Sequence, residues 1–401
     1  MEWKEVYIKD ICTVLGDGLH GTPEYDEKGD FYFINGNNLQ EGHITIKKDT
    51  KRVSQKEFLK YQKELNDRTI LVSINGTIGN VAKYNNEPCI LGKSACFFNV
   101  KEDIDRNFIY YVISSPHFKK SIIQQATGTT IKNVSLKQMR DYHFLIPVNL
   151  SDQRKIAGIL SALDSKIENN NKINANLEAQ AEALFKSWFV DFTPFKDQPF
   201  VDSELGSIPQ GWKVGKLGDY CECVLGGTPS RSESSYWNGD IAWINSGEVN
   251  KFRICTPSEF ITSKGLDNSS TKLLPKKTTV LAITGATLGQ ISILEIDSCA
   301  NQSVIGIKQN DNMPYEFIYP TVKVNIKRLL NLQTGGAQQH INKNNVQNLF
   351  IVYPPKFILQ KYKEHTKCIY SKISTLCFEN QRLAALRDTL LPKLMSGEIK
   401  L

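Results

Sequence analysis

The stretch that decides the fold is SDQRKIAGILSALDSKIENNNKINANLEAQAEALFKSW, residues 151–188. It contains no proline and one glycine, Gly158, and mostly apolar residues recur along it in alternating steps of four and three. That spacing is typical of a helix that pairs with another helix in a coiled coil. Ser151 favours a helix start, and Asp152 suits the first turn. We therefore expect a coiled-coil helix over 151–190, with its seam formed by Ile156, Leu160, Leu163, Ile167, Asn170, Asn174, Leu177, Ala181, Leu184 and Trp188.

A second seam follows at an offset of 206 residues, within the segment 356–401. We expect Pro392 to end that helix or to start a separate final turn, because a proline ring fits poorly inside a helix. The positions of this second seam are Tyr362, Thr366, Ile369, Ile373, Leu376, Asn380, Leu383, Arg387, Leu390 and Leu394.

Two amphipathic helices from one chain can bury their apolar stripes on each other as an antiparallel pair. Asn174 and Asn380 occupy equivalent positions near the middle of the two helices. We expect these side chains to hydrogen-bond across the seam and fix the register; the alternative is that both are solvated. A helix over 152–190 would span ~58 Å at ~1.5 Å per residue. This length predicts a dumbbell, with the rest of the chain at the two ends of the pair.

The segments that flank the helices are also duplicated. Phe33-Ile34-Asn35 returns as Trp243-Ile244-Asn245, and the offset drifts only from 210 to 207 along the chain. Short apolar runs broken by Gly, Asn and Pro alternate with helical stretches, which predicts a mixed α/β domain in each copy. The sequence thus predicts an α+β chain with an internal pseudo-twofold duplication: a domain at 1–150, a helix at 151–190, a proline-bearing linker at 191–211, a second domain at 212–355, and a helix with its tail at 356–401.

Composition sets broad limits on function. The 401 residues carry a net charge of +7, so a polyanionic partner such as nucleic acid is plausible. No stretch reads as a signal peptide or a membrane span. The nine cysteines are scattered along the chain, as expected for reduced thiols in the cytoplasm. Cys221-Glu222-Cys223 is too closely spaced for a usual zinc site, and we interpret it as part of a strand.

Several stretches resemble catalytic or cofactor-binding motifs, but each lacks a feature that the chemistry requires. The run 16–21 spells G-x-G-x-x-G, but Thr22-Pro23 follows where a nucleotide-binding helix should start. Gly92-Lys93-Ser94 lacks the first glycine of a phosphate-binding loop, and Tyr353-Pro354-Pro355 lacks the Asn or Asp of an amino-methyltransferase. Asp388 with 398–400 has nuclease-like spacing but lies in a predicted helix and tail. We expect no cofactor, no metal and no catalytic activity.

Several stretches resemble the specificity subunits of type I restriction–modification systems. Residues 150–170 and 177–192 resemble the central conserved region of that family, and 390–399 its distal conserved region. The runs 226–230 and 236–244 are similar to the opening of its target recognition domains. The first copy departs from this pattern, because Gly21-Thr22-Pro23-Glu24 is not followed by a Tyr-Trp pair. Likewise, Pro147-Val148 of the first copy corresponds to Pro354-Pro355 of the second. Such differences are expected where two domains read different half-sites.

The resemblance implies a non-catalytic subunit that binds double-stranded DNA. Each recognition domain would read one half of a bipartite asymmetric site, and the helices would set the spacing and dock two methyltransferase subunits. Motor-endonuclease (restriction) subunits would join in the full complex. The methyltransferases flip their target adenine out of the duplex. Two other classes stay open: a complete methyltransferase–nuclease enzyme, and a scaffold that does not bind DNA.

Candidate DNA contacts are the polar loop residues of the matched motifs. Asn and Gln can pair with adenine edges, Arg with guanine, and Thr with phosphate or a thymine methyl. The alternative role for each is turn formation. The candidates are Thr22, Asn35, Asn37, Asn38, Asn75, Thr77, Lys93, Thr129, Thr130, Lys132 and Asn133 in the first copy, and Thr228, Ser230, Arg231, Asn245, Thr284, Thr287, Gln302, Gln338, Gln339 and Asn342 in the second.

Overall fold

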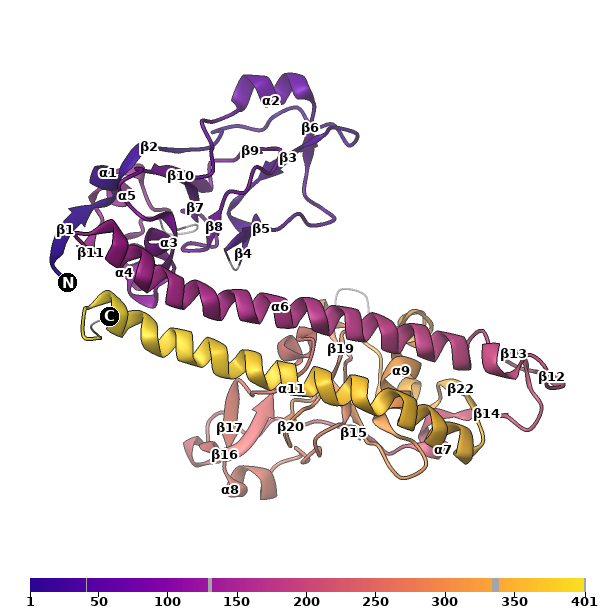
Figure 1. Ribbon diagram of the computed structural model, residues 1–401. Helices are drawn as coiled ribbons and strands as arrows, with labels where there is room; N and C mark the ends of the chain where they lie inside the picture. Colours follow the sequence, from indigo (N-terminus) through magenta and orange to yellow (C-terminus); the bar gives the residue numbers. More distant parts are fainter. Residues whose placement is uncertain (41, 129–131, 334–338, 400–401) are drawn as a thin grey trace. The chain divides into compact units, whose positions relative to one another are not determined.

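The computed structural model describes residues 1–40, 42–128, 132–333 and 339–399. The chain divides into two compact units: unit 1 comprises Met1–Lys166 with Leu383–Leu401, and unit 2 comprises Ile167–Arg382. Two helices of 40 residues, α6 (Leu150–Phe189) and α11 (Lys356–Met395), each contribute to both units (Figure 1). No helix in the described part of the chain is long and apolar enough to cross a membrane.

Unit 1 is built around an antiparallel four-stranded sheet in the order β2-β10-β7-β8. All residues of β7 and β10 are buried, which explains why they read as continuous apolar runs rather than as alternating patterns. The strands of this unit are β1 (Trp3–Tyr7), β2 (Cys12–Asp17), β3 (Phe31–Ile34), β4 (Leu39–Gln40), β5 (His43–Ile44), β6 (Arg52–Val53), β7 (Thr69–Ser73), β8 (Val81–Lys83), β9 (Cys89–Leu91), β10 (Ala95–Val100) and β11 (His143–Pro147).

Helices α2 to α5 of unit 1 each begin after a residue whose side chain caps the helix. Asp105 caps α3, and Ser115 caps α4, whose first residue is Pro116. The proline keeps α3 and α4 separate, because the residue before a proline is disfavoured in helical geometry. The helices are α1 (Ile8–Ile11), η1 (Gly36–Asn38), α2 (Gln55–Tyr61), α3 (Arg106–Ser114), α4 (Pro116–Gln125) and α5 (Leu136–Asp141).

The core of unit 1 is completed by the two long helices. Ile156 and Leu160 of α6 and Leu391 and Leu394 of α11 are buried in the same cluster as the sheet and α3. Trp3 packs against this cluster. The globular part of unit 1 therefore includes residues that are distant in sequence, from the start of α6 and the end of α11.

Unit 2 repeats the fold of unit 1. Its four-stranded sheet has the order β15-β21-β18-β19, which matches β2-β10-β7-β8 strand for strand. The two similar mixed α/β domains expected from the sequence are present. Its strands are β12 (Phe200–Ser203), β13 (Gly206–Pro209), β14 (Lys213–Lys216), β15 (Cys223–Leu225), β16 (Trp237–Ile244), β17 (Glu259–Ile261), β18 (Thr279–Ala282), β19 (Ile291–Ile293), β20 (Cys299–Ala300), β21 (Val304–Ile307) and β22 (Phe350–Tyr353).

The smaller helices of unit 2 also follow the order of unit 1. Asn342 caps α10 as Ser135 caps α5, and in both the capping side chain is part of a reciprocal capping box. The helices are η2 (Thr193–Phe195), α7 (Leu217–Tyr220), η3 (Ser234–Tyr236), η4 (Ser246–Asn250), α8 (Ser263–Asp267), η5 (Gly285–Thr287), α9 (Tyr315–Leu330) and α10 (Lys343–Gln347).

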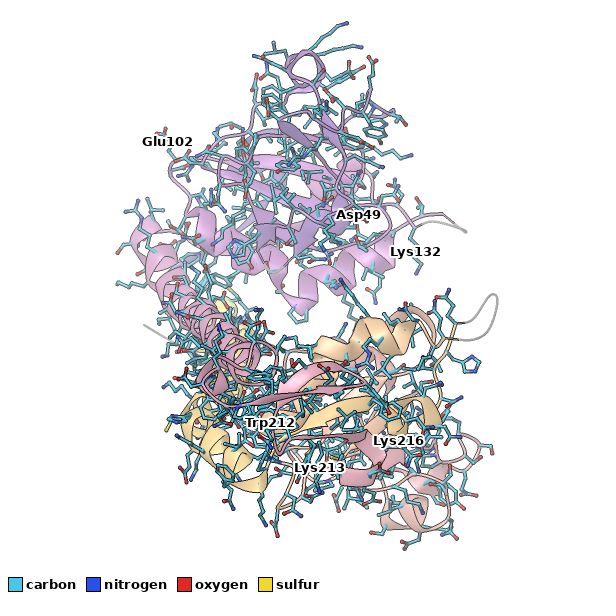
Figure 2. The ribbon with its side chains drawn as sticks, turned by 90° about the vertical axis from the view of Figure 1, so that its right-hand side faces the viewer. Asp49, Glu102, Lys132, Trp212, Lys213 and Lys216 are labelled. Carbon is cyan, nitrogen blue, oxygen red and sulfur yellow. The ribbon has the colours of Figure 1, made fainter. Side chains whose placement is uncertain are left out.

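The segment 191–211, expected as a linker, carries structure of its own. It forms η2 and the β12–β13 hairpin. The rings of Phe192 and Phe195 pack edge-on against Trp212, with ring centroids 5.4 and 5.1 Å from that of Trp212. Trp212 is labelled in Figure 2. These aromatic contacts fix the segment on unit 2, where Phe195 is buried in the core.

The expectation that Pro392 ends the second helix or begins a separate turn is wrong. Helix α11 continues through Pro392 to Met395. Pro392 lacks the N–H that would bond the carbonyl of Asp388, so one helical hydrogen bond is lost, and only one further turn of helix follows it. Leu391 and Leu394, on either side of it, are buried in the core of unit 1, and their packing supports the last turn.

Within unit 2 the two long helices lie antiparallel. Asn170 Nδ2 donates to Asn380 Oδ1 at 2.8 Å, and farther along the pair the rings of Trp188 and Tyr362 lie 5.7 Å apart. Residue numbers therefore rise along α6 as they fall along α11. The repeat offset between the two helices is 206 residues. Residue 172 of α6 therefore faces its own repeat equivalent, residue 378 of α11.

The expected hydrogen bond between Asn174 and Asn380 is therefore absent from this part of the pair. Asn174 Nδ2 instead faces Cys377 Sγ at 3.6 Å, and Asn380 Nδ2 donates to Asn171 Oδ1 at 2.8 Å. Residues 172 and 378 face each other, so Asn174 faces position 376 of the antiparallel helix. Asn380 lies four residues, about one helical turn, beyond that position. The buried polar contact is made by Asn170 with Asn380, not by the repeat-equivalent pair.

Candidate nucleic-acid interface

Polar loops of unit 1 converge where β3 and β7 end and where β9 turns into β10. Asn35 follows β3, Asn75 follows β7, and Lys93 with Ser94 joins β9 to β10. Ser94 Oγ donates to Asn35 Oδ1 at 3.0 Å and accepts from the Gly36 amide at 2.9 Å. The loops after β3 and β9 are therefore joined by side chain and backbone.

Backbone hydrogen bonds add two more loops to this site. Ile74 N donates to Ser94 O at 3.0 Å, and Val134 N donates to Ile74 O at 2.9 Å. Asn75 and Asn133 form an isolated backbone bridge, with their side chains 3.5 Å apart. We name residues 35–37, 74–79, 92–94 and 132–134 loop cluster 1.

The same backbone hydrogen bonds recur in unit 2. Ile283 N donates to Ser303 O at 2.9 Å, as Ile74 does to Ser94, and Ile341 N donates to Ile283 O at 3.0 Å, as Val134 does to Ile74. Thr284 forms an isolated bridge with His340. We name residues 245–247, 284–289, 301–303 and 339–342 loop cluster 2.

Glycines hold the same positions in both clusters. Gly76 and Gly285 have φ angles of +71° and +62°, and Gly79 and Gly289 have +87° and +85°. These left-handed conformations are costly for residues with a Cβ. The turns after β7 and β18 are thus kept in one shape, although the residues around them differ.

Most candidate DNA contacts fall on these two clusters and are at least partly exposed. Asn37, Thr77, Lys93, Lys132 and Asn133 are exposed in cluster 1, and Figure 2 labels Lys132. Asn35 and Asn75 are half-buried. In cluster 2, Gln302, Gln339 and Asn342 are exposed, and Asn245, Thr284 and Thr287 are half-buried. Thr129, Thr130 and Gln338 lie outside the described residues.

Asn38 has to be removed from the candidate set. Its side chain is 4% exposed, and its Oδ1 accepts from the Asn35 amide at 3.0 Å while its Nδ2 donates to Thr45 O and Thr50 Oγ1. Glu248 closes the equivalent loop of unit 2 by accepting from the Asn245 amide at 3.2 Å. Asn38 therefore shapes the loop from inside and is not available to a ligand.

Asn342 also has a structural role, since its Oδ1 accepts from Asn345 N at 2.9 Å as the N-cap of α10. The repeat-equivalent Ser135 was not among the candidates. Because Asn342 is exposed, capping does not exclude a second role for its amide group.

A second group of candidates lies on the loop before β16. Thr228 Oγ1 donates to Gln302 Oε1, which joins this loop to cluster 2. Ser230 is exposed and pairs with Ser232 at 2.8 Å. In unit 1, Thr22 is exposed on the corresponding loop. Lys93 N donates to Leu19 O at 3.0 Å, so this loop also approaches its cluster.

Arg231 is held by Trp237 and Glu259, neither of which was among the candidate DNA contacts. Its guanidinium lies 3.6 Å from the ring centroid of Trp237, and both terminal nitrogens donate to Glu259. Hydrogen bonding to Glu259 raises the pKa of Arg231, and the same contact lowers the pKa of Glu259. The Tyr-Trp motif was noted only for its resemblance. It could have signalled this cation–π contact.

The groups gathered at both clusters are mainly amides, hydroxyls and a few cations, which suit hydrogen bonds to a polar or anionic ligand. Among the described residues, no three His, Cys, Asp or Glu side chains are grouped to hold a metal ion. Burial raises the pKa of Cys221 to about 12 and that of Cys223 to about 11, so both remain thiols in the core beside β15.

Comparisons with known proteins identify the family. The family model for the type I restriction modification DNA specificity domain matches residues 1–179 and again residues 209–386. The chain belongs to this family of type I restriction–modification specificity proteins. Relatives of the chain are named specificity subunits of type I restriction enzymes, in agreement with the resemblance found in the sequence.

Relatives are found in both archaea and bacteria. The type I restriction enzyme MjaIX specificity subunit of Methanocaldococcus jannaschii is 28% identical over all of this chain and 94% of its own length. The HindI specificity subunit of Haemophilus influenzae is 27% identical over 71% of this chain and 75% of its own length. The solved S subunit from Mycoplasma genitalium has the same fold, with a TM-score of 0.58, 18% identity, and coverage of 98% of this chain and 96% of that one.

Proposed function

We propose that loop clusters 1 and 2 each read one half of a bipartite, asymmetric DNA site. One observation carries this proposal: the two clusters share their backbone hydrogen bonds but differ in the side chains that this backbone presents. Asn75 of the first copy corresponds to Thr284 of the second, and Lys93 corresponds to Gln302. A common framework suits a common ligand shape, the DNA groove, while different side chains suit different bases.

The side chains of each cluster match particular contacts. In cluster 1, Asn35, Asn37, Asn75 and Asn133 offer amides for adenine edges, and Lys93 and Lys132 suit guanine or phosphate. In cluster 2, Gln302 and Gln339 offer amides, while Thr284 and Thr287 suit phosphate or thymine methyl contacts. On the neighbouring loop before β16, Thr228 and Ser230 suit the same contacts. Arg231 is exposed but held by Glu259, so a base contact requires it to release or share that carboxylate.

We further propose that α6 and α11 form an antiparallel coiled coil that sets the spacing of the half-sites. The contacts between Asn170 and Asn380 and between Trp188 and Tyr362 support the pairing. We propose that two methyltransferase subunits dock on the helices and domains, with restriction subunits joining in the full complex. Ile159, Ile173, Leu386 and Phe357 are large apolar side chains exposed on the helices, and substituting each of them tests whether a protein partner binds there. The nine free thiols fit a cytoplasmic setting.

The test is co-expression of the chain with its cognate methyltransferase subunit in a methylation-free host, followed by genome-wide mapping of methyladenine. We expect one split motif, with a few specified bases on either side of a fixed gap. Replacing residues 1–150 by another such domain should change one half of the motif only.

Two outcomes would contradict the proposal. A contiguous motif would contradict the spacing role of the helices. A soluble complex that leaves no methyladenine, although the methyltransferase is active with another specificity subunit, would favour the scaffold alternative. Methylation by the purified chain alone would instead revive the enzyme alternative.

A further inference from the structure

Two cysteines of unit 2 lie against each other at the boundary between the domain and α11. Cys255 is buried in the loop after η4, and Cys377 is half-buried on α11. Each cysteine shifts the pKa of the other, and Asn174 Nδ2 approaches Cys377 Sγ at 3.6 Å. Both cysteines line one cavity of about 210 Å³, which gives small solutes a route to the sulfur atoms.

The surroundings of the two thiols make them chemically different. The hydrogen bond with Cys255 lowers the pKa of Cys377, although burial acts in the opposite direction, and the cation of Arg253 adds to the lowering. The same hydrogen bond, together with burial, raises the pKa of Cys255. Two further charged groups act on both cysteines: Lys277 lowers their pKa values, and Glu295 raises them. Because the thiolate is the nucleophilic form, Cys377 is the more reactive of the two.

We propose that Cys377 and Cys255 form a reversible disulfide when the protein meets hydrogen peroxide. The Cys377 thiolate attacks one peroxide oxygen, the O–O bond breaks, and hydroxide leaves, so the sulfur becomes a sulfenic acid. Cys255 then gives up its proton and attacks the Cys377 sulfur, which forms the S–S bond and releases the sulfenic oxygen as water. Two thiols are oxidised by two electrons, and one peroxide is reduced to two waters.

The cross-link would join the loop 251–256 to α11 and thus fix the second domain to its helix. At the repeat-equivalent positions of the first copy, the offsets of 210 and 206 place Thr45 and Asn171. The first copy therefore cannot form this bond. The cross-link is a property of the second copy alone, and it does not depend on which DNA sequence the protein reads.

The test uses the reduced full-length chain, treated with increasing hydrogen peroxide, alkylated with N-ethylmaleimide and analysed by peptide mass spectrometry. Cys368 is the internal control, because it lies on the same helix and is exposed. We expect a Cys255–Cys377 cross-linked peptide, lighter by two hydrogen atoms and restored by dithiothreitol. Free Cys377 should disappear about tenfold faster than free Cys368.

A matched variant separates the two steps. In Cys255→Ser the sulfenic acid of Cys377 lacks its partner, so dimedone should label Cys377 in this variant and not in the parent chain. Equal loss of Cys368 and Cys377, or oxidation of Cys377 to sulfinic acid in the parent chain without a cross-link, would overturn the proposal. The parent-chain experiment stands by itself if the variant does not fold.

Discussion

The two copies keep the same sheet but attach it to the long helices by different chemistry. In unit 2, Arg253 is 1% exposed in its side chain and donates to Glu178 of α6 at 2.8 Å. Lys323 of α9 also contacts Glu178, at 3.0 Å. In unit 1, Tyr111 of α3 donates to Asp164 of α6 at 2.6 Å, and Arg387 of α11 pairs with the same carboxylate at 2.7 Å.

Few of these groups are repeat equivalents. Phe108-Ile109-Tyr110 matches Phe317-Ile318-Tyr319, so Tyr111 corresponds to Pro320. Asp164 corresponds to Tyr370, and His43 stands at the position that corresponds to Arg253. Duplication preserved the backbone framework of both copies, whereas the side chains that attach each domain to the long helices diverged, as did those of the loop clusters. Unit 2 uses a buried ion-pair network, and unit 1 uses a half-exposed one.

Glu178→Gln should produce the largest loss of stability among these contacts. The substitution leaves Arg253 buried without its counter-charge, and removing one partner of a buried pair costs about 3 kcal/mol. Chemical unfolding of the full chain, followed by a probe in unit 2 such as the fluorescence of its tryptophans, measures the effect. A cost below ~1 kcal/mol would show that the Arg253 site is wetter than the structure indicates.

Acid should remove the same contribution in the parent chain. Burial opposes ionisation of Glu178, but Arg253 and Lys323 outweigh it, so the pKa lies below the ordinary value of 4.5. A lowered pKa stabilises the folded state above the unfolded pKa, and this stabilisation is lost as the pH falls through the folded pKa. The stability difference between the parent and Glu178→Gln should therefore shrink as the pH falls below 4.5. A difference that stays constant down to complete acid unfolding would contradict the charged pair.

Much of this fold could be predicted from the sequence, because repeated landmarks and heptad spacing are local patterns. Glycines that recur in both copies, such as Gly79 and Gly289, allowed the two copies to be aligned. The crossing point of the helices could not be predicted, because packing such as that of Trp188 on Tyr362 sets it. For this reason the expected Asn174–Asn380 bond was one turn out of register.

The candidate site was predicted in part, and for a related reason. Polar loop residues look alike whether they face a ligand or close a turn, so Asn38 was included although it is buried. The repeat-equivalent residue Glu248 argues against a DNA contact at Asn38, because a carboxylate is repelled by the phosphates of DNA. The partners Arg253 and Glu178 are 75 residues apart, and no periodicity connects them.

Exchanging matched residues of the loop clusters tests whether each copy reads its own half-site. Lys93→Gln gives cluster 1 the residue found at Gln302, and Gln302→Lys makes the reciprocal change. We expect each variant to alter discrimination in one half of the site only, by about 1–3 kcal/mol at the affected base pair. Competition binding of the complex with oligonucleotides mismatched in one half or the other measures this, and mapping of methyladenine gives a second readout.

Lys56→Gln is the matched control, because it removes the same charge from α2, outside loop cluster 1. It should leave both halves of the motif unchanged. If Lys93→Gln weakens binding to all sequences equally and lowers the salt dependence by about one ion, Lys93 contacts phosphate rather than a base. Changes in both halves from either single variant would contradict a separate reader in each copy.

Asp164→Asn should have the smallest effect, and it sharpens the contrast between the two attachments. The carboxylate is 30% exposed in its side chain, Tyr111 can still donate to the amide oxygen, and Arg387 keeps Asp388 at 2.8 Å. Solvent screening limits such a pair to about 1 kcal/mol or less. Unfolding of the full chain gives the comparison, with Asp141→Asn as control because its pair with Lys9 is exposed. A loss as large as that of Glu178→Gln would mean that the two copies are fastened equally firmly by different residues, and that divergence changed the chemistry of attachment without changing its strength.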